Sequence, residues 1–141
     1  MKIVIVEDQP LLRQNLKQQI DEARLGFEVV GLAASVTEGI GVIIQKKPDF
    51  VFFDIEIVEG TSFDILDALP DINFKSVFVT AHGHFAIKAI KYSAFDFLVK
   101  PVDNGELINT LERLKTEFNQ QEDYKEKFEI LFNELLSLIH I

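Results

Sequence analysis

Five short apolar runs alternate with amphipathic stretches along this chain, and this alternation constrains its fold more than any other feature of the sequence. Strands that are separated by helical segments of this length form a parallel sheet with right-handed crossovers and helices on both faces. The sequence therefore predicts the α/β class. The predicted strands are KIVIV at 2–6, FEVVGLA at 27–33, DFVFFD at 49–54, SVFVTA at 76–81 and FDFLV at 95–99, and the predicted helices cover 11–20, 36–45, 62–69, 85–92 and 106–114.

The length of 141 residues suits one domain with a single core and a short appended element, and it leaves no room for a second full domain. Hydrophobic residues make up 48% of the chain, a share that excludes intrinsic disorder over most of its length. The absence of cysteine removes disulfides, thiolate catalysis and thiolate metal sites, and it is compatible with a reducing cytosol.

Charge and hydropathy exclude several classes of partner and several cellular locations for the protein. The formal net charge of -9 argues against nucleic-acid binding by these residues, because contacts to phosphate need a basic face. No apolar run approaches the roughly 20 residues that a membrane span requires, and the first ten residues meet charge too early to form a secretion signal. We therefore expect a cytoplasmic protein with no membrane contact.

Polar residues directly follow four of the predicted strands, at the edge where an open parallel sheet binds its ligands. Glu7 and Asp8 follow the first strand, Asp54 the third, Thr80 closes the fourth, and Lys100 follows the fifth. If the strand order is 2-1-3-4-5, the first and third strands are neighbours roughly 4.8 Å apart. The three carboxylates then converge on one small volume.

Three carboxylates this close together need a neutralising partner, because each pair near 4 Å repels by about 4 kcal/mol at an effective dielectric of about 20. Either protons or a cation can supply the neutralisation. Oxygen-only ligands suit a hard divalent ion that keeps some of its waters, so the sequence predicts a Mg2+ site. The same ion can bridge to a phosphoryl group and neutralise its charge during transfer.

The acid pair, the lone aspartate, Thr80-Ala81 and Lys100-Pro101 occur in the order seen in one family, and the chain resembles the receiver domain of two-component response regulators over residues 1–118. The stretches at 54–66 and 81–107 look most like the receivers that precede a LytTR DNA-binding domain. The resemblance implies a flavodoxin-like, CheY-like fold: a doubly wound, five-stranded parallel sheet in the order 2-1-3-4-5 with an extra C-terminal helix.

The resemblance also implies a role for each acid. Asp54 would be the phosphoacceptor that attacks the phosphohistidine of a sensor histidine kinase and becomes an acyl phosphate. Asp8 would bind Mg2+ directly, Glu7 would hold the ion mainly through water, and Asp54 would be a further ligand. Glu56 would contribute its backbone carbonyl to the same ion.

Three more residues have roles implied by the resemblance. Lys100 would neutralise the phosphoryl oxygens, Thr80 would donate its hydroxyl to one of them, and Phe97 would turn inward once Thr80 has moved. The result is a phosphorylation-dependent switch with slow self-dephosphorylation, not an enzyme. The face of the fourth helix and fifth strand would then pair with a partner in a phosphorylation-linked homodimer.

The chain departs from the family pattern in three places. Ile57 and Val58 stand where many members have Met-Pro, so the turn after Asp54 is less fixed in φ. Phe97 lacks the hydroxyl of the common tyrosine, which leaves packing alone to separate its two states. Glu56 and His82 occupy positions that tune the acyl-phosphate lifetime in the family, and their direction of effect stays open.

Residues 119–141 form a predicted helical tail beyond the receiver. A polar stretch, NQQEDYKEK, separates two apolar stripes at helical spacing, so the tail is predicted as a second helical segment. It either packs back on the domain, or serves as a signalling helix or dimerising seam toward an output domain absent from this chain, through which alone DNA would be bound. The stripes are Leu107, Leu111, Leu114 and Phe118, and then Phe128, Leu131, Phe132, Leu135 and Leu138.

Other interpretations remain open at this point. Taken singly, Glu7 and Asp8 are a solvated strand end, Asp54 a helix cap, and His82 with His84 exposed loop residues outside the metal site. A stand-alone receiver that acts by protein contact alone fits the same residues. An Asp-nucleophile phosphohydrolase would need a second aspartate where Glu56 stands, and a dinucleotide site would need glycines after the first strand.

Overall fold

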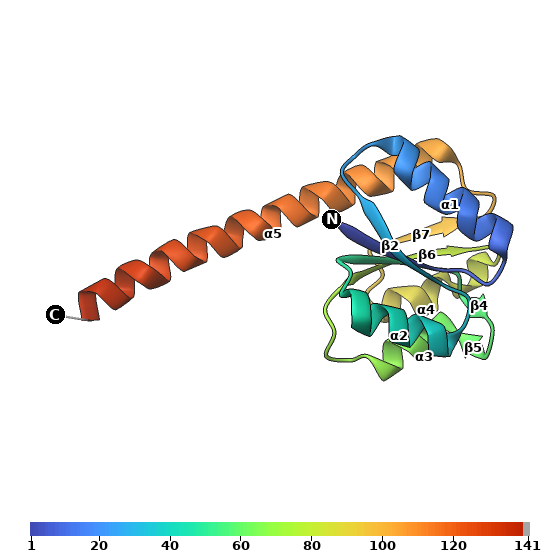
Figure 1. Ribbon diagram of the computed structural model, residues 1–141, viewed down its shortest axis with the longest axis horizontal. Helices are drawn as coiled ribbons and strands as arrows, with labels where there is room; N and C mark the ends of the chain where they lie inside the picture. The colour runs from blue at the N-terminus through green and yellow to red at the C-terminus, as the bar shows by residue number, and fades with distance from the viewer. Residues whose placement is uncertain (140–141) are drawn as a thin grey trace.

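The computed structural model describes residues 1–139 and contains a five-stranded parallel sheet covered by helices on both faces (Figure 1). The order is β2-β1-β3-β6-β7, and every neighbouring pair is parallel. Because β6 and β7 are the fourth and fifth strands of this sheet, the predicted order 2-1-3-4-5 is confirmed. The bounds are β1 Lys2–Val6, β2 Glu28–Ala33, β3 Phe50–Phe53, β6 Lys75–Thr80 and β7 Asp96–Val99.

The helices begin where the sequence supplies start signals. Pro10 opens α1, the Ser35 side chain caps α2 by accepting a hydrogen bond from the Glu38 amide, and Thr61 with Asp64 forms a capping box at α3. These local signals fix the point at which each helix leaves its strand. The bounds are α1 Pro10–Ala23, α2 Val36–Lys46, α3 Ser62–Ala68, the 3-10 turn η1 Gly83–Phe85, α4 Ala86–Lys91 and α5 Asn104–Ile139.

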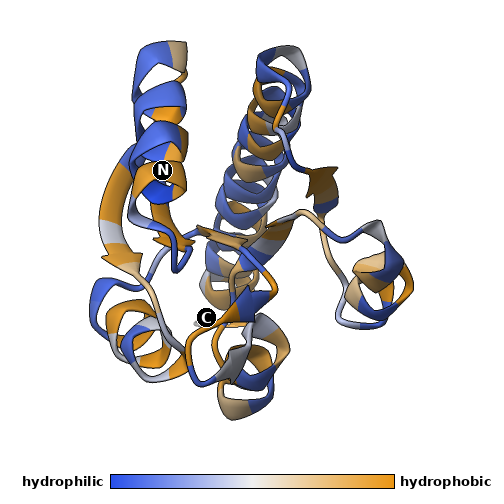
Figure 2. Cartoon of the chain, turned by 90° about the vertical axis from the view of Figure 1, so that its right-hand side faces the viewer, coloured by the Kyte–Doolittle hydropathy of each residue, from blue (hydrophilic) through white to orange (hydrophobic). Residues whose placement is uncertain are grey.

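Each strand buries alternate residues in two different cores, which explains why the runs are apolar throughout. On one face, Ile3 and Ile5 pack beneath α1 and the first half of α5. On the other face, Val4 and Val6 pack with residues of α2, α3 and α4. Figure 2 shows the consequence, a largely hydrophobic sheet between helices that carry both hydrophobic and hydrophilic sides.

A small hairpin that was not predicted follows β3. Its strands, β4 (Glu56–Ile57) and β5 (Gly60–Thr61), are antiparallel and joined by a tight turn in which Glu59 has a φ of 76°. Ile57 is buried below the hairpin and anchors it in the core beside α2 and α3. The loop after Asp54 is thus held by the packing of Ile57, although residues 55–60 contain no proline to fix φ.

The predicted C-terminal helix is present, but as a continuation of α5 instead of a separate segment. Helix α5 runs unbroken for 36 residues, because no proline or glycine follows Gly105 and the polar stretch between the stripes consists mostly of good helix formers. Residues 119–139 are exposed and project away from the sheet (Figure 1). They do not pack back on the domain, and residues 140 and 141 of the predicted tail lie outside the described part.

Among residues 1–139, no helix is both long enough and apolar enough to cross a membrane.

Candidate functional site

The predicted carboxylates meet at the carboxyl edge of the sheet. Val6 of β1 pairs with Phe53 of β3, so the residues that follow them, Glu7 and Asp54, emerge side by side. The Asp54 amide donates a hydrogen bond of 2.8 Å to the Val6 carbonyl and fixes this register. Glu7, Asp8 and Asp54 each offer a carboxylate oxygen, and these oxygens all lie within 4.8 Å of one another.

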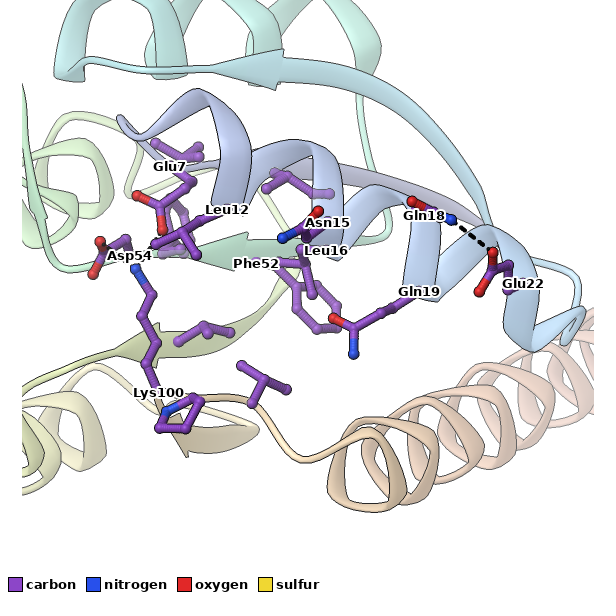
Figure 3. A pocket seen from close by; sticks show the side chains of 16 residues that line it. Glu7, Leu12, Asn15, Leu16, Gln18, Gln19, Glu22, Phe52, Asp54 and Lys100 are labelled. Atoms are coloured by element: carbon purple, nitrogen blue, oxygen red, sulfur yellow. Dashed lines mark hydrogen bonds and ion pairs between the residues drawn. The ribbon is translucent and has the colours of Figure 1, made fainter.

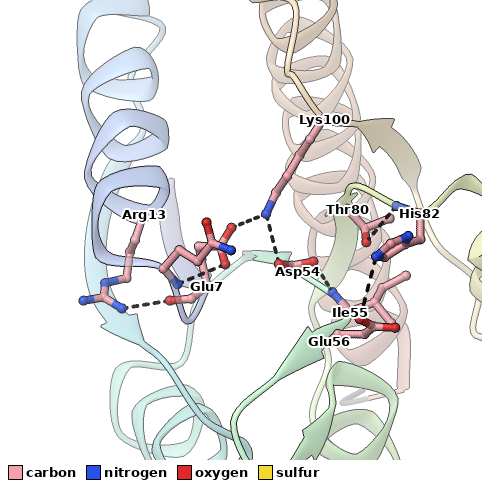
Figure 4. A network of polar contacts seen from close by, with 9 residues as sticks. Glu7, Arg13, Asp54, Ile55, Glu56, Thr80, His82 and Lys100 are labelled. Carbon is pink, nitrogen blue, oxygen red and sulfur yellow. Dashed lines mark hydrogen bonds and ion pairs between the residues drawn. The ribbon is translucent and has the colours of Figure 1, made fainter.

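Lys100 reaches this cluster from the other side of the sheet. Its backbone amide donates to the Thr80 carbonyl at 2.8 Å, which places it at the end of β7 beside β6. The ammonium group then extends to the cluster, donating to Asp54 Oδ2 at 3.0 Å and also to Glu7 Oε1 (Figure 4). The long side chain therefore carries a positive charge from the end of β7 to the carboxylates at the ends of β1 and β3.

Burial and hydrogen bonding shift the pKa values of Glu7 and Lys100. Desolvation raises the pKa of Glu7 from its ordinary 4.5 to about 7, even though the hydrogen bond from Lys100 acts in the opposite direction. Burial lowers the pKa of Lys100, but its hydrogen bonds to Glu7 and Asp54 outweigh this effect and leave the pKa raised. Lys100 is thus a fixed cation, whereas Glu7 is a carboxylate that ionises near neutral pH.

We predict that the metal-free protein loses stability as the pH rises from 6 to 8. A carboxyl group whose pKa is raised on folding stabilises the fold fully below its unfolded value of 4.5, and this contribution disappears above the folded value of about 7. Part of this contribution is already lost between pH 4.5 and 6, so the loss expected from Glu7 between pH 6 and 8 is about 1.4 kcal/mol of unfolding free energy. Urea titrations at a series of pH values without metal measure it.

Two variants isolate the Glu7 contribution in those titrations. Glu7→Gln cannot ionise, so its unfolding free energy should stay nearly flat over this pH interval. Glu126→Gln, a substitution of the same kind at an exposed site on α5, should keep the wild-type slope. Equal slopes for Glu7→Gln and the wild type would contradict the assignment.

Asp54 is open to a groove despite its position at the sheet edge. The groove has a volume of about 680 Å³ and runs between α1 and the loop from β7 to α5. Figure 3 shows Glu7, Asp54 and Lys100 together at one end of it, with Leu12 and Leu16 of α1 along its side. The Asp54 side chain is 11% exposed. An incoming group can therefore reach this carboxylate without unfolding the site.

Thr80 lies beside the cluster but does not join it. Its side chain is buried, and its hydroxyl accepts a hydrogen bond of 3.4 Å from the His82 amide. Phe97, one strand over, is half-buried against the core beneath α4. The structure thus places Thr80 and Phe97 on neighbouring strands, and their roles in the switch stay predictions.

The Glu56 side chain points to a different partner from the other acids. Its Oε2 lies 3.8 Å from His82 Nε2, on the Thr80 side of Asp54 (Figure 4). The His82 side chain is 50% exposed and that of Glu56 is 61% exposed, so this pair lies at the solvent-facing border of the site. The predicted role of the Glu56 backbone carbonyl as a metal ligand stays a prediction.

Sequence reasoning missed two polar contacts that shape the site. Arg13, one turn into α1, donates to the Glu7 carbonyl at 2.8 Å and holds the end of β1. Asp96 of β7 accepts hydrogen bonds from Thr110 and Arg113 of α5, and so ties the strand that carries Lys100 to the long helix. Neither contact could be predicted from the sequence, because the first depends on the conformation of the loop between β1 and α1 and the second on the packing of α5 against β7.

The donor set at the sheet edge fits a hard divalent cation. Three carboxylates supply oxygen atoms only, and Asp8 and Asp54 are partly open to solvent, which leaves room for the waters that Mg2+ retains. Lys100 neutralises part of this negative charge. A metal ion bound here would share Asp54 and Glu7 with the lysine.

Comparisons with known proteins agree on one family. The chain matches the family model described as the response regulator receiver domain over residues 3–112. It is 37% identical over 123 residues to the transcriptional regulatory protein BtsR of Escherichia coli (strain K12), covering 86% of this chain and 51% of that protein. It is 29% identical over 129 residues to the sensory transduction protein LytT of Bacillus anthracis, covering 90% and 52%.

A solved structure shows the same likeness. The response regulatory domain of protein mrkE from Klebsiella pneumoniae is 30% identical and superposes with a TM-score of 0.79, over 85% of this chain and 99% of that chain. The chain spans about half the length of the curated relatives that it matches.

Proposed function

Since the chain belongs to the response regulator receiver domain family, we propose that it accepts a phosphoryl group on Asp54 from the phosphohistidine of a sensor histidine kinase. The observation that carries the proposal is the contact of Lys100 with Asp54 inside the three-carboxylate cluster. A cation that reaches from a different strand to an acid lining the groove can stabilise the charge that develops when a phosphoryl group is transferred to that carboxylate.

The chemistry is a displacement at phosphorus. A carboxylate oxygen of Asp54 attacks, the P–N bond to the kinase imidazole breaks, and its electron pair stays on the imidazole nitrogen. Lys100 stabilises the charge on the transferring oxygens through its ammonium group. Asp8, Glu7 and Asp54 would hold Mg2+, together with the Glu56 carbonyl, and the ion would neutralise phosphoryl charge when bound.

Phosphorylation would act on the rest of the domain through charge. A phosphoryl group adds about -1.5 to -2 charges at Asp54, which attracts Lys100 and the Thr80 hydroxyl. Thr80 would exchange its present contact with the His82 amide for a phosphoryl oxygen, and Phe97 would move into the space that it leaves. The protein would therefore act as a switch and not as a turnover enzyme.

The output surface that we propose is the exposed face of α4 and β7. Ile87 and Ile90 of α4 are 72% and 73% exposed, and Val99 at the end of β7 is 47% exposed. Large apolar side chains at this level of exposure favour a protein contact. We propose that this face pairs with its equivalent in a second, phosphorylated chain.

The output itself is proposed to be a LytTR-type DNA-binding domain outside this chain, in a cytoplasmic regulator. The support is that relatives about twice as long carry names for transcriptional regulation and sensory transduction. A stand-alone receiver that acts by protein contact is the alternative. A phosphohydrolase finds no support in the residues, because Glu56 occupies the position of its second aspartate.

The test is a labelling experiment on the full chain. With a small acyl phosphate and Mg2+, we expect about one phosphate per chain on a phosphate-affinity gel. Chelation of the metal should slow labelling about tenfold or more, because the oxygens of the phosphoryl group then lose their divalent counter-ion. Release of many phosphates per chain would instead show a hydrolase, and the absence of any label would overturn the proposal.

A further inference from the structure

The second half of α5 carries a row of large apolar side chains that nothing in the described chain covers. Phe128, Leu131 and Leu135 are 67%, 59% and 57% exposed, and the helix that bears them extends beyond the domain (Figure 1). A contiguous apolar surface of this kind marks an interaction site. Its own domain cannot be the partner, because the rigid helix carries the row away from the sheet.

The spacing of the row identifies the kind of partner. We define the tail seam as Tyr124, Phe128, Leu131, Leu135 and Leu138, which follow one another at steps of four, three, four and three residues. These steps average 3.5 residues, the repeat that two supercoiled helices need to keep their apolar residues in contact. A seam of this repeat is complementary to a second copy of itself.

Charge argues against the other classes of partner. Residues 119–139 contain five acidic side chains against two lysines, Lys125 and Lys127. Nucleic acid requires a basic surface, and helices that lie on anionic membranes carry lysine and arginine on their polar face. The polar side of this helix suits neither, so a protein surface is the occupant that the charges allow.

The residues beside the seam are compatible with self-pairing. Phe132 stacks on Phe128 within the same helix, with ring centroids 6.2 Å apart and planes at 13°, and widens the apolar surface on one side. Lys127 and Glu134 flank the other side one heptad apart. In a parallel, in-register pair these two positions face Phe132 and Ile139 of the second copy, so pairing brings no like charges together across the seam.

We propose that the tail seam joins two copies of this chain as a helical pair, whether or not Asp54 is phosphorylated. This inference goes beyond the proposed function, since it concerns an assembly that exists before any signal arrives. It would keep two receivers at high local concentration. Phosphorylation would then change how the receivers are arranged within a dimer that already exists.

The test is the mass of the full chain in solution, measured by light scattering without phosphodonor and with chelator. We expect twice the chain mass of 16.1 kDa. The double variant Leu131→Glu, Leu135→Glu should raise the dimer dissociation constant at least about a hundredfold, because it puts charge in the centre of the interface. A monomeric wild type at high micromolar concentration would overturn the proposal.

The matched control is Ile130→Glu. Ile130 is next to Leu131 in sequence and is 52% exposed, but it lies outside the tail seam. This variant should remain dimeric, and dissociation equal to that of the double variant would overturn the proposal. Helix content from circular dichroism and labelling of Asp54 should be unchanged in both, which separates loss of pairing from loss of folding or of the phosphoacceptor.

Cysteine scanning gives a second readout, because the chain has no cysteine of its own. Under mild oxidation, Leu131→Cys should link two chains efficiently, whereas Ile130→Cys should link them at least about tenfold less well. Equal linking at both positions would overturn the proposal. Asp54→Asn should leave linking at position 131 unchanged, so a failure of the phosphoacceptor assignment and a failure of the pairing can be told apart.

Discussion

Asp54→Asn should reduce phosphorylation of the chain to background, at least about a hundredfold below the wild type. Asparagine has nearly the same shape as aspartate and keeps an oxygen that can accept the hydrogen bond from the Ile55 amide, which is 2.7 Å long. It lacks the anionic oxygen that attacks phosphorus. Because Lys100 retains Glu7 as a partner, the variant should fold normally, and the loss should be one of chemistry alone.

The control for this experiment is Asp49→Asn, at the opposite end of the same strand. Asp49 accepts a hydrogen bond of 2.8 Å from the Lys2 amide, and an asparagine oxygen can accept it equally well. Labelling with a small acyl phosphate should be at the wild-type level in this variant. Persistent stoichiometric labelling of Asp54→Asn would show that another residue is the phosphoacceptor and would remove the central assignment.

Lys100→Met should lower the unfolding free energy of the metal-free protein by about 3 kcal/mol at pH 8. The lysine contacts two carboxylates whose side chains are only 5% and 11% exposed, and its removal leaves them facing each other without a cation. The loss should shrink at lower pH, because protonation of Glu7 relieves the repulsion. Urea unfolding at two pH values measures both effects.

Lys17→Met is the matched control for that substitution. Lys17 pairs with Asp21 at 3.0 Å, but its side chain and that of Asp21 are 38% and 47% exposed, so the expected loss is below about 1 kcal/mol. Mg2+ should stabilise Lys100→Met more than it stabilises the wild type, because the ion no longer competes with the lysine. Similar losses in the two variants would mean that Lys100 does not neutralise the cluster.

The fold was predictable because the apolar runs are continuous and alternate regularly with amphipathic segments. Strands such as β3, buried on both faces, need a continuous apolar run, and the amphipathic segments between them allow only crossovers to a parallel sheet. The position of the site followed, because parallel strands end at one edge. The proximity of Glu7 and Asp54 could be predicted only by assuming that the first and third strands are neighbours, because the spacing of the strands along the chain does not determine their order in the sheet.

The remainder depended on contacts between distant segments. The hairpin of β4 and β5 has strands of two residues each, too short to leave a periodic pattern, and packing of Ile57 fixes it. The way in which the negative charge of the acids is neutralised could not be predicted in full. The sequence required protons or a cation, and the structure shows that Lys100 supplies one positive charge and that Glu7 can retain a proton near neutral pH.

Because α5 is unbroken, a small tilt at its base produces a large displacement of its far end. The helix is fastened at its root to β7 through Asp96 and Arg113, and the part beyond residue 118 is about 30 Å long at 1.5 Å per residue. A tilt of about 10° at the root therefore sweeps the far end through about 5 Å. A displacement of β7 that is too small to disturb the core thus becomes, at the tip, a movement comparable to a full helical turn.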